Sequence, residues 1–360
     1  MPDSANAPSS PYGDLWHALD NLLANASPEA IRAHALGPLE VRRRTTSGEA
    51  VPALLAAEAR VAAFAMLSVR PLLERVRLSC EGPLVLMKGP EIALRYPDGA
   101  RGFTDIDLLT PEAEHVHGQL REAGFIEAGE DAAFVQPPQH LRPLKWPGLP
   151  LQVEVHGRPK WPDGLDAPPT PAIVGSARPS ELGVEGILAP VDAHHALLVA
   201  AHAWAHEPLW RLRDLADVRV LAPPSERAAI ERTARAWGMT RLWQTTDRVT
   251  DAVVGRSRMP LLTRLWAGHL LEHRERTVLE NHLRDYMAAY WALPTTAAFA
   301  SAGQAFAEDF FPAPGQTWSN KLSRMLTASR NAKTPMSHHS SRLEQARTGA
   351  PQPGRRRDDD

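Results

Sequence analysis

The sequence is short of cysteine, of net charge and of long apolar runs, and each shortage excludes a class of protein. One cysteine, Cys80, cannot form an internal disulfide, so we expect a reducing cytoplasm. A formal net charge of −2 argues against a broad electrostatic grip on nucleic acid, so no nucleic-acid partner is expected. No stretch approaches the ~20 uninterrupted apolar residues of a membrane helix, and the N-terminus lacks a basic segment followed by an apolar one. We therefore expect neither membrane association nor a secretory signal.

What the chain does contain changes character along its length. Apolar residues make up 43% of it, which is enough for a sizeable core. We divide the chain into residues 1–12, expected to be disordered; 13–79, an N-terminal helical segment; 80–160, an α/β core; 161–189, a proline-rich connector; 190–312, a helical domain; and 313–360, expected to be a disordered tail. Within the helical segment, "RRRTTSGEA" (42–50) is interpreted as a solvated linker.

The middle of the chain alternates between predicted strands and predicted helices. "LVLMK" (84–88) and "FTDIDLL" (103–109) are typical of buried strands, and "LPLQVEVHGRP" (149–159) alternates apolar with polar residues as a half-buried strand does. Predicted helices lie between them and on both sides. The fold class expected is therefore α+β: a small mixed-sheet core flanked by an N-terminal helical segment and a C-terminal helical domain.

Two carboxylates interrupt the apolar run "FTDIDLL". In a strand, residues i and i+2 point to the same face, so Asp105 and Asp107 should project together. Two buried carboxylates repel unless something neutralises them, and a divalent cation such as Mg²⁺ does so well. Glu154 would be a third ligand if the strand at 149–159 lies beside them. The alternative is structural, because such a pair is often only an exposed strand edge or a cap.

The segment before these aspartates has the makings of a phosphate-binding turn. Lys88 ends a predicted strand, and Gly89 followed by proline opens a predicted helix. Backbone N–H groups at a helix N-terminus bind anions, and glycine lets a phosphate approach closely. Otherwise Lys88 is simply a solvent-facing strand end. A phosphate cradle beside a metal site is the combination that the residues favour.

Taken together, these motifs resemble a known family. The order "L-x-K-G … Y-P … R-G-x-x-D-I-D-L-L … V-E-V-H" is similar to the uncharacterised nucleotidyltransferase-like family of bacteria, a branch of the polymerase-β-type nucleotidyltransferase superfamily. The resemblance implies an NTP co-substrate and Mg²⁺, with Mn²⁺ as the alternative cation. It implies that the catalytic, metal-binding acids are Asp105, Asp107 and Glu154, and that Lys88, Gly89, Arg101 and His156 contribute to cofactor binding.

A second, weaker likeness lies in the expected helical domain. "HAWAHEPLWRLRDLADV" resembles the helical "H…H…RL…D" segment of that family, with His202, His206, Arg211 and Asp217 at the matching positions. These side chains could reach the nucleotide pocket if the helical domain closes over it. The alternatives are a zinc site on one helix face, ordinary packing, or ion pairs of Asp214 and Asp217 with Arg211 and Arg213.

Two classes of function remain open at this stage. The first is an Mg²⁺-dependent nucleotidyltransferase that moves a nucleotidyl, or a phosphoryl, group from an NTP to an acceptor hydroxyl on an unidentified small molecule, peptide or protein. The second is a non-catalytic module that binds a nucleotide or a partner protein encoded nearby, in the manner of an antitoxin. The three intact acids favour the enzyme.

Overall fold

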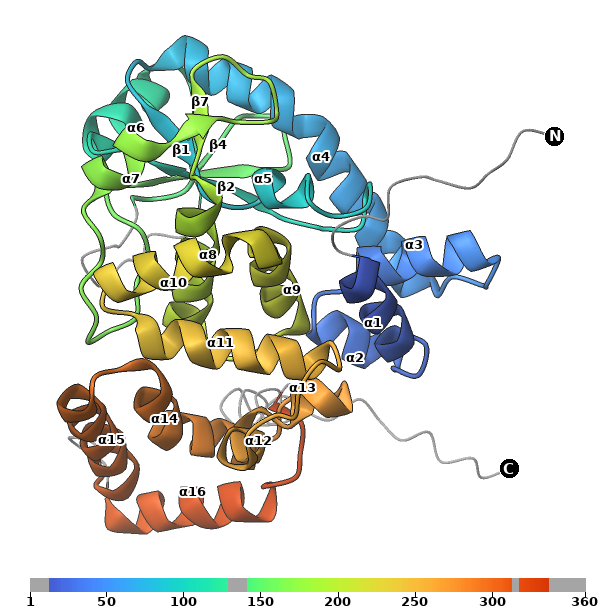
Figure 1. The fold of residues 1–360 in the computed structure, drawn as a ribbon, viewed down its shortest axis with the longest axis vertical. Coiled ribbons are helices and arrows are strands. Elements are labelled where there is room, and N and C mark those ends of the chain that lie inside the picture. The colour runs from blue at the N-terminus through green and yellow to red at the C-terminus, as the bar shows by residue number, and fades with distance from the viewer. Residues whose placement is uncertain (1–12, 129–140, 313–316, 337–360) are drawn as a thin grey trace.

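The computed structural model describes residues 13–128, 141–312 and 317–336 (Figure 1). The disorder expected for residues 1–12, and for 313–316 and 337–360 of the tail, falls outside these residues. The strands are β1 (Leu84–Leu86), β2 (Asp105–Leu109), β3 (Ile126–Glu127), β4 (Leu144–Lys145), β5 (Gln152–His156), β6 (Arg178–Pro179) and β7 (Ile187–Ala189).

Helices precede, interrupt and follow the strands. Those up to the last strand are α1 (Gly13–Leu23), α2 (Pro28–Ala33), α3 (Gly37–Ser47), α4 (Ala53–Ser79), α5 (Pro90–Ala93), α6 (Ala113–Glu122) and α7 (Thr170–Ser176). Those after it are α8 (Asp192–His206), α9 (Leu212–Leu221), the 3₁₀ helix η2 (Pro224–Glu226), α10 (Arg227–Ala236), α11 (Thr240–Val253), α12 (Leu261–Ala267), α13 (His269–Glu272), α14 (Val278–Ala292), α15 (Thr295–Phe310) and α16 (Trp318–Arg330). None of the helices in the described part of the chain combines the length and the apolar character that a membrane crossing requires.

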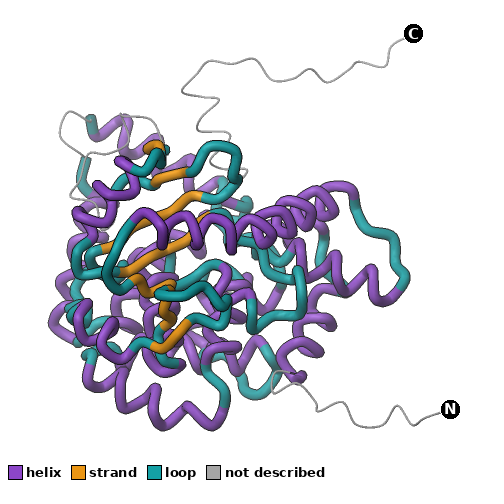
Figure 2. The backbone as a smooth tube through the Cα atoms, turned by 90° about the horizontal axis from the view of Figure 1, so that it is seen from above, coloured by secondary structure: helices purple, strands orange, loops and turns teal. Residues whose placement is uncertain are grey.

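All of these strands belong to one mixed sheet with the order β3-β4-β5-β2-β1-β7-β6. The pairs β2–β5 and β1–β7 are parallel, and the others are antiparallel. Figure 2 shows the strands as a layer enclosed by helices. The expected α+β class is confirmed, since the sheet lies among helices that come before it and after it in the chain.

Alternation along the strands gives the sheet two different faces. Ile106 and Leu108 of β2 point to a cluster that includes Leu72 of α4 and Leu120 of α6. The opposite face carries Leu109 and joins the core formed with the helices after the sheet. Asp105 and Asp107 share the face of Leu109 because side chains two residues apart in a strand point the same way. They therefore face the helical part of the protein.

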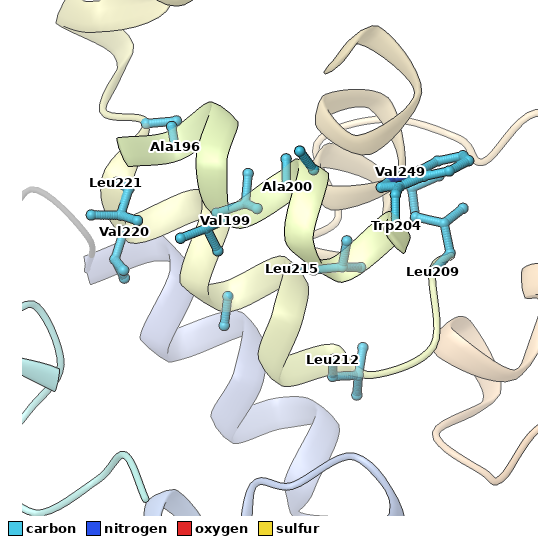
Figure 3. Close-up of a cluster of buried hydrophobic side chains, with 14 of the residues drawn as sticks. Ala196, Val199, Ala200, Trp204, Leu209, Leu212, Leu215, Val220, Leu221 and Val249 are labelled. Atoms are coloured by element: carbon cyan, nitrogen blue, oxygen red, sulfur yellow. The ribbon is translucent and has the colours of Figure 1, made fainter. Parts of the chain in front are cut away.

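The helical part packs against that second face through α8 and α9. The sequence of α8 is rich in alanine and leucine, which allows this helix to be buried on several sides. The buried side chains labelled in Figure 3 are Ala196, Val199, Ala200, Trp204, Leu209, Leu212, Leu215, Val220, Leu221 and Val249. This core holds the start of α9 at a fixed place opposite the sheet.

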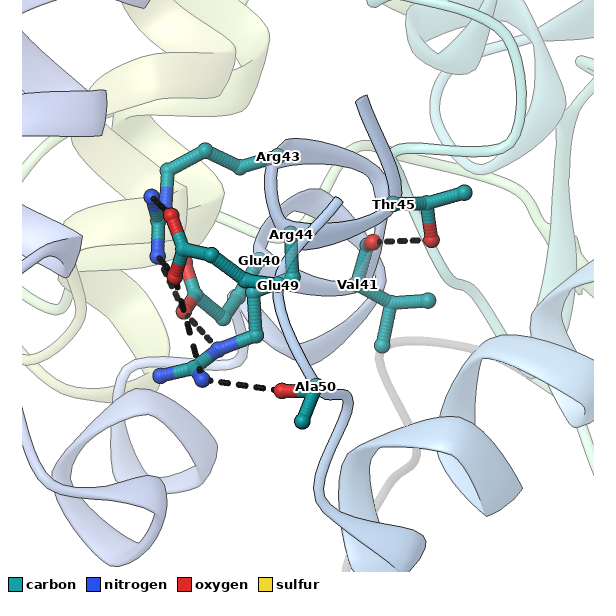
Figure 4. A network of polar contacts seen from close by, with 7 residues as sticks. All are labelled: Glu40, Val41, Arg43, Arg44, Thr45, Glu49 and Ala50. Carbon is teal, nitrogen blue, oxygen red and sulfur yellow. Dashed lines mark hydrogen bonds and ion pairs between the residues drawn. The ribbon is translucent and has the colours of Figure 1, made fainter. Parts of the chain in front are cut away.

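The expected exposure to solvent holds for residues 45–50, whereas the expectation of a linker at 42–50 is wrong, because residues up to Ser47 belong to α3. The reason is Glu40, whose side chain is fully buried and accepts hydrogen bonds from two of the three consecutive arginines (Figure 4). Arg43 Nε lies 2.8 Å from Glu40 and Arg43 Nη1 lies 2.7 Å from Glu49. A buried carboxylate needs such partners, so these arginines stabilise α3 through Glu40 instead of extending into solvent from a loop.

Two other segments contain more structure than the sequence suggested. In the connector 161–189, β7 pairs in parallel with β1 and extends the sheet, and proline is tolerated because Pro179 lies on an edge strand. In the tail 313–360, the described residues include α16, whose cap Thr317 accepts from the N–H of Asn320. The chain then returns to the segment just before α14, where the Met336 N–H donates to the carbonyl oxygen of Arg276.

Candidate active site

The site begins with the register of β2 against β5. The two strands are parallel, and Asp105, Asp107 and Leu109 lie opposite Gln152, Glu154 and His156. Asp107 and Glu154 are therefore neighbours on the face toward α8. This pairing follows from the alternation in both strands, because burying Val153 and Val155 on the far side turns Glu154 and His156 toward the aspartates.

Asp107 is the most enclosed of the acids, with 1% of its surface exposed. Its Oδ1 lies 3.0 Å from His156 Nε2, and its Oδ2 lies 3.5 Å from the Lys88 ammonium. Burial alone would raise the pKa of Asp107, but Lys88 and His156 outweigh it and hold that pKa well below its ordinary value. Asp107 is thus an ionised carboxylate in a buried place.

Asp105 shows the opposite behaviour two residues earlier. It lies at the edge of a pocket, and burial together with the Asp107 charge raises its pKa above the ordinary value. Two carboxylates so close favour a state in which only one is charged, unless a cation joins them. The pair therefore has room for added positive charge on the Asp105 side.

A metal-binding group of side chains surrounds Asp107. Within the described residues, one oxygen of Asp107, one of Glu154 and a ring nitrogen of His156 lie within 4.8 Å of one another. His156 Nε2 is 3.6 Å from Glu154 Oε2. Asp105 is outside this group, whereas the sequence placed it with Glu154. Asp107 Oδ2 is buried without a hydrogen-bond partner, so the donor set fits a divalent cation.

The turn that precedes α5 approaches this strand closely. Gly89 has φ +63°, and a Cβ built on it would lie 2.8 Å from the carbonyl oxygen of Asp105. Glycine is therefore required by both the backbone angle and the contact. The helix that Gly89 opens has only four residues, so its dipole adds little to phosphate binding. What remains of the expected cradle is the turn itself and the Lys88 side chain.

Arg101 occupies a different position from the one expected of a phosphate contact. Its guanidinium donates to both carboxylate oxygens of Asp217, at 2.7 and 2.8 Å, and to the carbonyl of Gly89 at 2.8 Å. The Tyr96 hydroxyl also donates to Asp217 at 2.7 Å. Arg101 thereby ties the glycine turn to α9. Its pairing replaces the Asp217–Arg213 pair considered from the sequence.

The histidines of α8 reach the sheet rather than forming a site of their own. His195 Nε2 lies 2.7 Å from the carbonyl oxygen of Met87, and His202 Nε2 accepts from the Lys88 ammonium at 2.6 Å. Lys160 Nζ lies 2.9 Å from His206. Sequence reasoning missed Lys160, which follows β5 in a loop and carries no motif. Among the described residues no zinc-like cluster involves α8.

A pocket of about 300 Å³ lies between the glycine turn and the two helices. We call its two sides the sheet wall and the helical wall. The sheet wall consists of Lys88, Gly89, Arg101, Gly102, Phe103, Thr104 and Asp105, and the helical wall of Val199, His202, Ala203, His206, Trp210, Arg211, Arg213, Asp214 and Asp217. The pocket thus opens beside the acids, and its lining combines four cationic side chains with three carboxylates, so positive charge is available to a polyanion.

The comparison with protein families covers both walls. A family model described as "Uncharacterised nucleotidyltransferase" matches residues 25–254, which is more than half of the 360 residues. No curated protein and no solved structure matches the chain. The matched span includes β1 to β7 and helices α8 to α11.

Proposed function

Because the chain belongs to the uncharacterised nucleotidyltransferase family, we propose that it transfers a nucleotidyl group from an NTP to an acceptor hydroxyl, using Mg²⁺ or Mn²⁺. The observation that carries the proposal is the ionised, buried Asp107 with one oxygen left without a hydrogen bond, beside Glu154 and a pocket lined with cations. A buried carboxylate oxygen without a partner is costly, and a bound cation would remove that cost.

Asp105, Asp107 and Glu154 would hold the cation, and His156 would keep Asp107 in place through its 3.0 Å contact. When bound, a divalent cation supplies positive charge to the phosphate oxygens as negative charge develops in the reaction. Lys88 would bind a phosphate oxygen from the other side of the site. The turn at Gly89 packs closely against the Asp105 carbonyl oxygen and so holds Lys88 near β2.

In the transfer, the acceptor oxygen forms a bond to the α-phosphorus. The bond between the α-phosphorus and the oxygen that bridges it to the β-phosphorus breaks, and pyrophosphate leaves. The acceptor proton passes to the Glu154 carboxylate, which acts as general base. Attack at the γ-phosphorus instead would transfer a phosphoryl group and release an NDP, so the released product distinguishes the two reactions.

The test combines a binding measurement with label transfer. Wild-type protein is melted with each of the four NTPs, with and without Mg²⁺, and then incubated with [α-³²P]NTP and fractions of a cell extract as acceptor. A ligand at ~100 times its dissociation constant should add about 2.7 kcal/mol of stability. We expect Asp107→Asn to lose the Mg²⁺-dependent shift and to lower label transfer by about 10³-fold, which corresponds to about 4 kcal/mol.

The matched control is Asp163→Asn, which makes the same chemical change at an exposed loop position. It should behave as wild type in both assays. Undiminished label transfer by Asp107→Asn, or the absence of any Mg²⁺-dependent shift and of any transfer by the wild type, would overturn the proposed enzyme.

One observation supports the second candidate, a non-catalytic module that binds a nucleotide or a partner protein. The Lys88 ammonium lies 3.5 Å from one oxygen of Asp107 and His156 Nε2 lies 3.0 Å from the other, so Asp107 has polar neighbours on both oxygens without a cation. Such a module would give a nucleotide-dependent shift that does not require Mg²⁺, and no transfer of label to any fraction. The same two assays therefore separate the candidates.

A further inference from the structure

Two arginines on the helical wall lack the carboxylate partners that the buried arginines of this protein have. Arg211 and Arg213 flank the start of α9 and are half-buried in the pocket lining. In the described part of the chain, neither guanidinium forms an ion pair with a carboxylate, and the Nε atom of each is buried without a hydrogen bond.

The contrast with the fully buried arginines is consistent. Each of those three has a carboxylate partner: Arg101 pairs with Asp217, Arg219 with Asp251, and Arg276 with Glu207. Burying a guanidinium without a counter-ion is costly, and a fold that gives Arg101, Arg219 and Arg276 a carboxylate gives none to these two. The missing partner is an anion that the polypeptide does not supply.

The two charges also act on each other. Burial and the nearby Arg213 charge lower the pKa of Arg211. The Arg211 guanidinium carbon lies 3.8 Å from the centre of the Trp210 ring, which holds the group in place by a cation–π contact. Two like charges fixed so close together repel, and an oxyanion between them would turn that repulsion into two attractions.

Their position relative to the acids indicates which oxyanion this is. Arg213 and Asp105 line the same pocket. Lys88, which ion-pairs with Asp107, lines the same pocket. A chain of negative charges that begins at the acids with their cation would therefore continue along Arg213 toward Arg211.

We propose that Arg211 and Arg213 bind the β- and γ-phosphates of the nucleotide, so that the helical wall recognises the triphosphate and rejects nucleotides with fewer phosphates. This assignment rests on the proposed function for the identity of the ligand. Guanidinium groups suit it because they form paired, charge-assisted hydrogen bonds with phosphate oxygens. Asp214, on the same wall, separates the pair from Asp217 along the helix.

The test uses inorganic tripolyphosphate, and ATP, GTP, CTP and UTP with the corresponding monophosphates, in titration calorimetry with Mg²⁺. We expect Arg211→Ala and Arg213→Ala each to weaken binding of tripolyphosphate and of the bound NTP by at least about tenfold, with little change for its monophosphate. Lysine at either position should restore part of the affinity. Arg235→Ala, which removes an exposed arginine from α10, is the charge-matched control and should bind as wild type.

The ligand-free proteins provide a second readout that a structural role would not give. Because the pair is repulsive without its anion, both alanine variants should melt at or above the wild-type temperature. Equal weakening of NTP and monophosphate, unchanged affinity, or a lower melting temperature with unchanged affinity would overturn the assignment. Tripolyphosphate binding that depends on the arginines, without label transfer, would support the assignment and contradict the proposed enzyme, so the two failures are distinct.

Discussion

The two walls of the pocket treat their charges differently. On the sheet wall and directly behind it, Lys88 forms an ion pair with Asp107, and Asp107 also contacts His156 Nε2. On the helical wall, Arg211 and Arg213 have no carboxylate partner among the described residues. Lys88 on the sheet wall thus has an acidic partner in the free protein, whereas Arg211 and Arg213 on the helical wall have none within ion-pair distance among the described residues. An enclosed charge without a partner is the more direct pointer to a ligand.

The largest loss of stability is expected from breaking the ion pair between Arg101 of the sheet wall and Asp217 of the helical wall. Arg101→Met would leave Asp217 and the Tyr96 hydroxyl enclosed without their cation, which should lower the free energy of unfolding by roughly 3–5 kcal/mol in urea denaturation. The cause is visible in the pKa of Asp217, which burial would raise but which Arg101 holds below its ordinary value. A matched change at the exposed Arg70–Glu74 pair, Arg70→Met, should cost less than about 1 kcal/mol.

A double variant sharpens this prediction. Replacing Asp217 by leucine in the Arg101→Met background removes the stranded carboxylate and should recover part of the lost stability. If Arg101→Met is as stable as the wild type, the Arg101–Asp217 ion pair does not hold the two walls together.

The same contrast explains which parts were predictable from the sequence. The sheet wall rests on local patterns: alternation in "DIDLL" and "QVEVH" fixes which side chains share a face, and Gly89 marks a turn with a positive φ. The strand containing Asp105 and Asp107, the neighbouring strand of Glu154 and the α+β class therefore followed from sequence. The grouping of His156 rather than Asp105 with Asp107 and Glu154 did not, because it depends on side-chain directions that periodicity does not determine.

The helical wall was much harder to predict. Arg101 and Asp217 are far apart in the chain, and nothing in either segment indicates that they meet. Arg211 was expected to reach the nucleotide pocket, which it lines, whereas the pairing of Arg211 and Arg213 with nearby aspartates was the alternative. The structure shows that long-range packing decides such pairs. The same limit applies to Arg43 and Arg44, which were expected to be solvated but donate to the buried Glu40.

The second prediction concerns the contact of α8 with the sheet wall. His195 is buried against the Met87 carbonyl, and burial lowers its pKa from 6.5 to about 4. The unfolded chain therefore binds a proton that the folded protein does not, and stability present above pH 6.5 is lost as the pH falls toward 4. The loss from this residue should reach about 3 kcal/mol.

The measurement is urea denaturation at several pH values between 4 and 7. His195→Gln keeps a hydrogen-bond donor but cannot take up the proton, so its stability should fall less steeply with acid than that of the wild type. His34 and His269 are also buried with lowered pKa values and should keep part of the slope. Parallel curves for variant and wild type would show that the α8 contact with the sheet wall is not sensitive to acid.

The smallest expected effect is a difference in stability between two Gly→Ala variants, which separates the cost of a positive φ from the cost of a close contact. Gly89→Ala meets both penalties, because φ is +63° and the new Cβ would lie 2.8 Å from the Asp105 carbonyl oxygen. Gly99→Ala meets only the first, since φ is +71° and nothing lies within 4 Å. We expect a loss of about 1 kcal/mol for Gly99→Ala and about 2–3 kcal/mol for Gly89→Ala. The difference of about 1–2 kcal/mol measures how firmly β2 is held against the turn. Equal losses would mean that β2 moves easily away from the added methyl group.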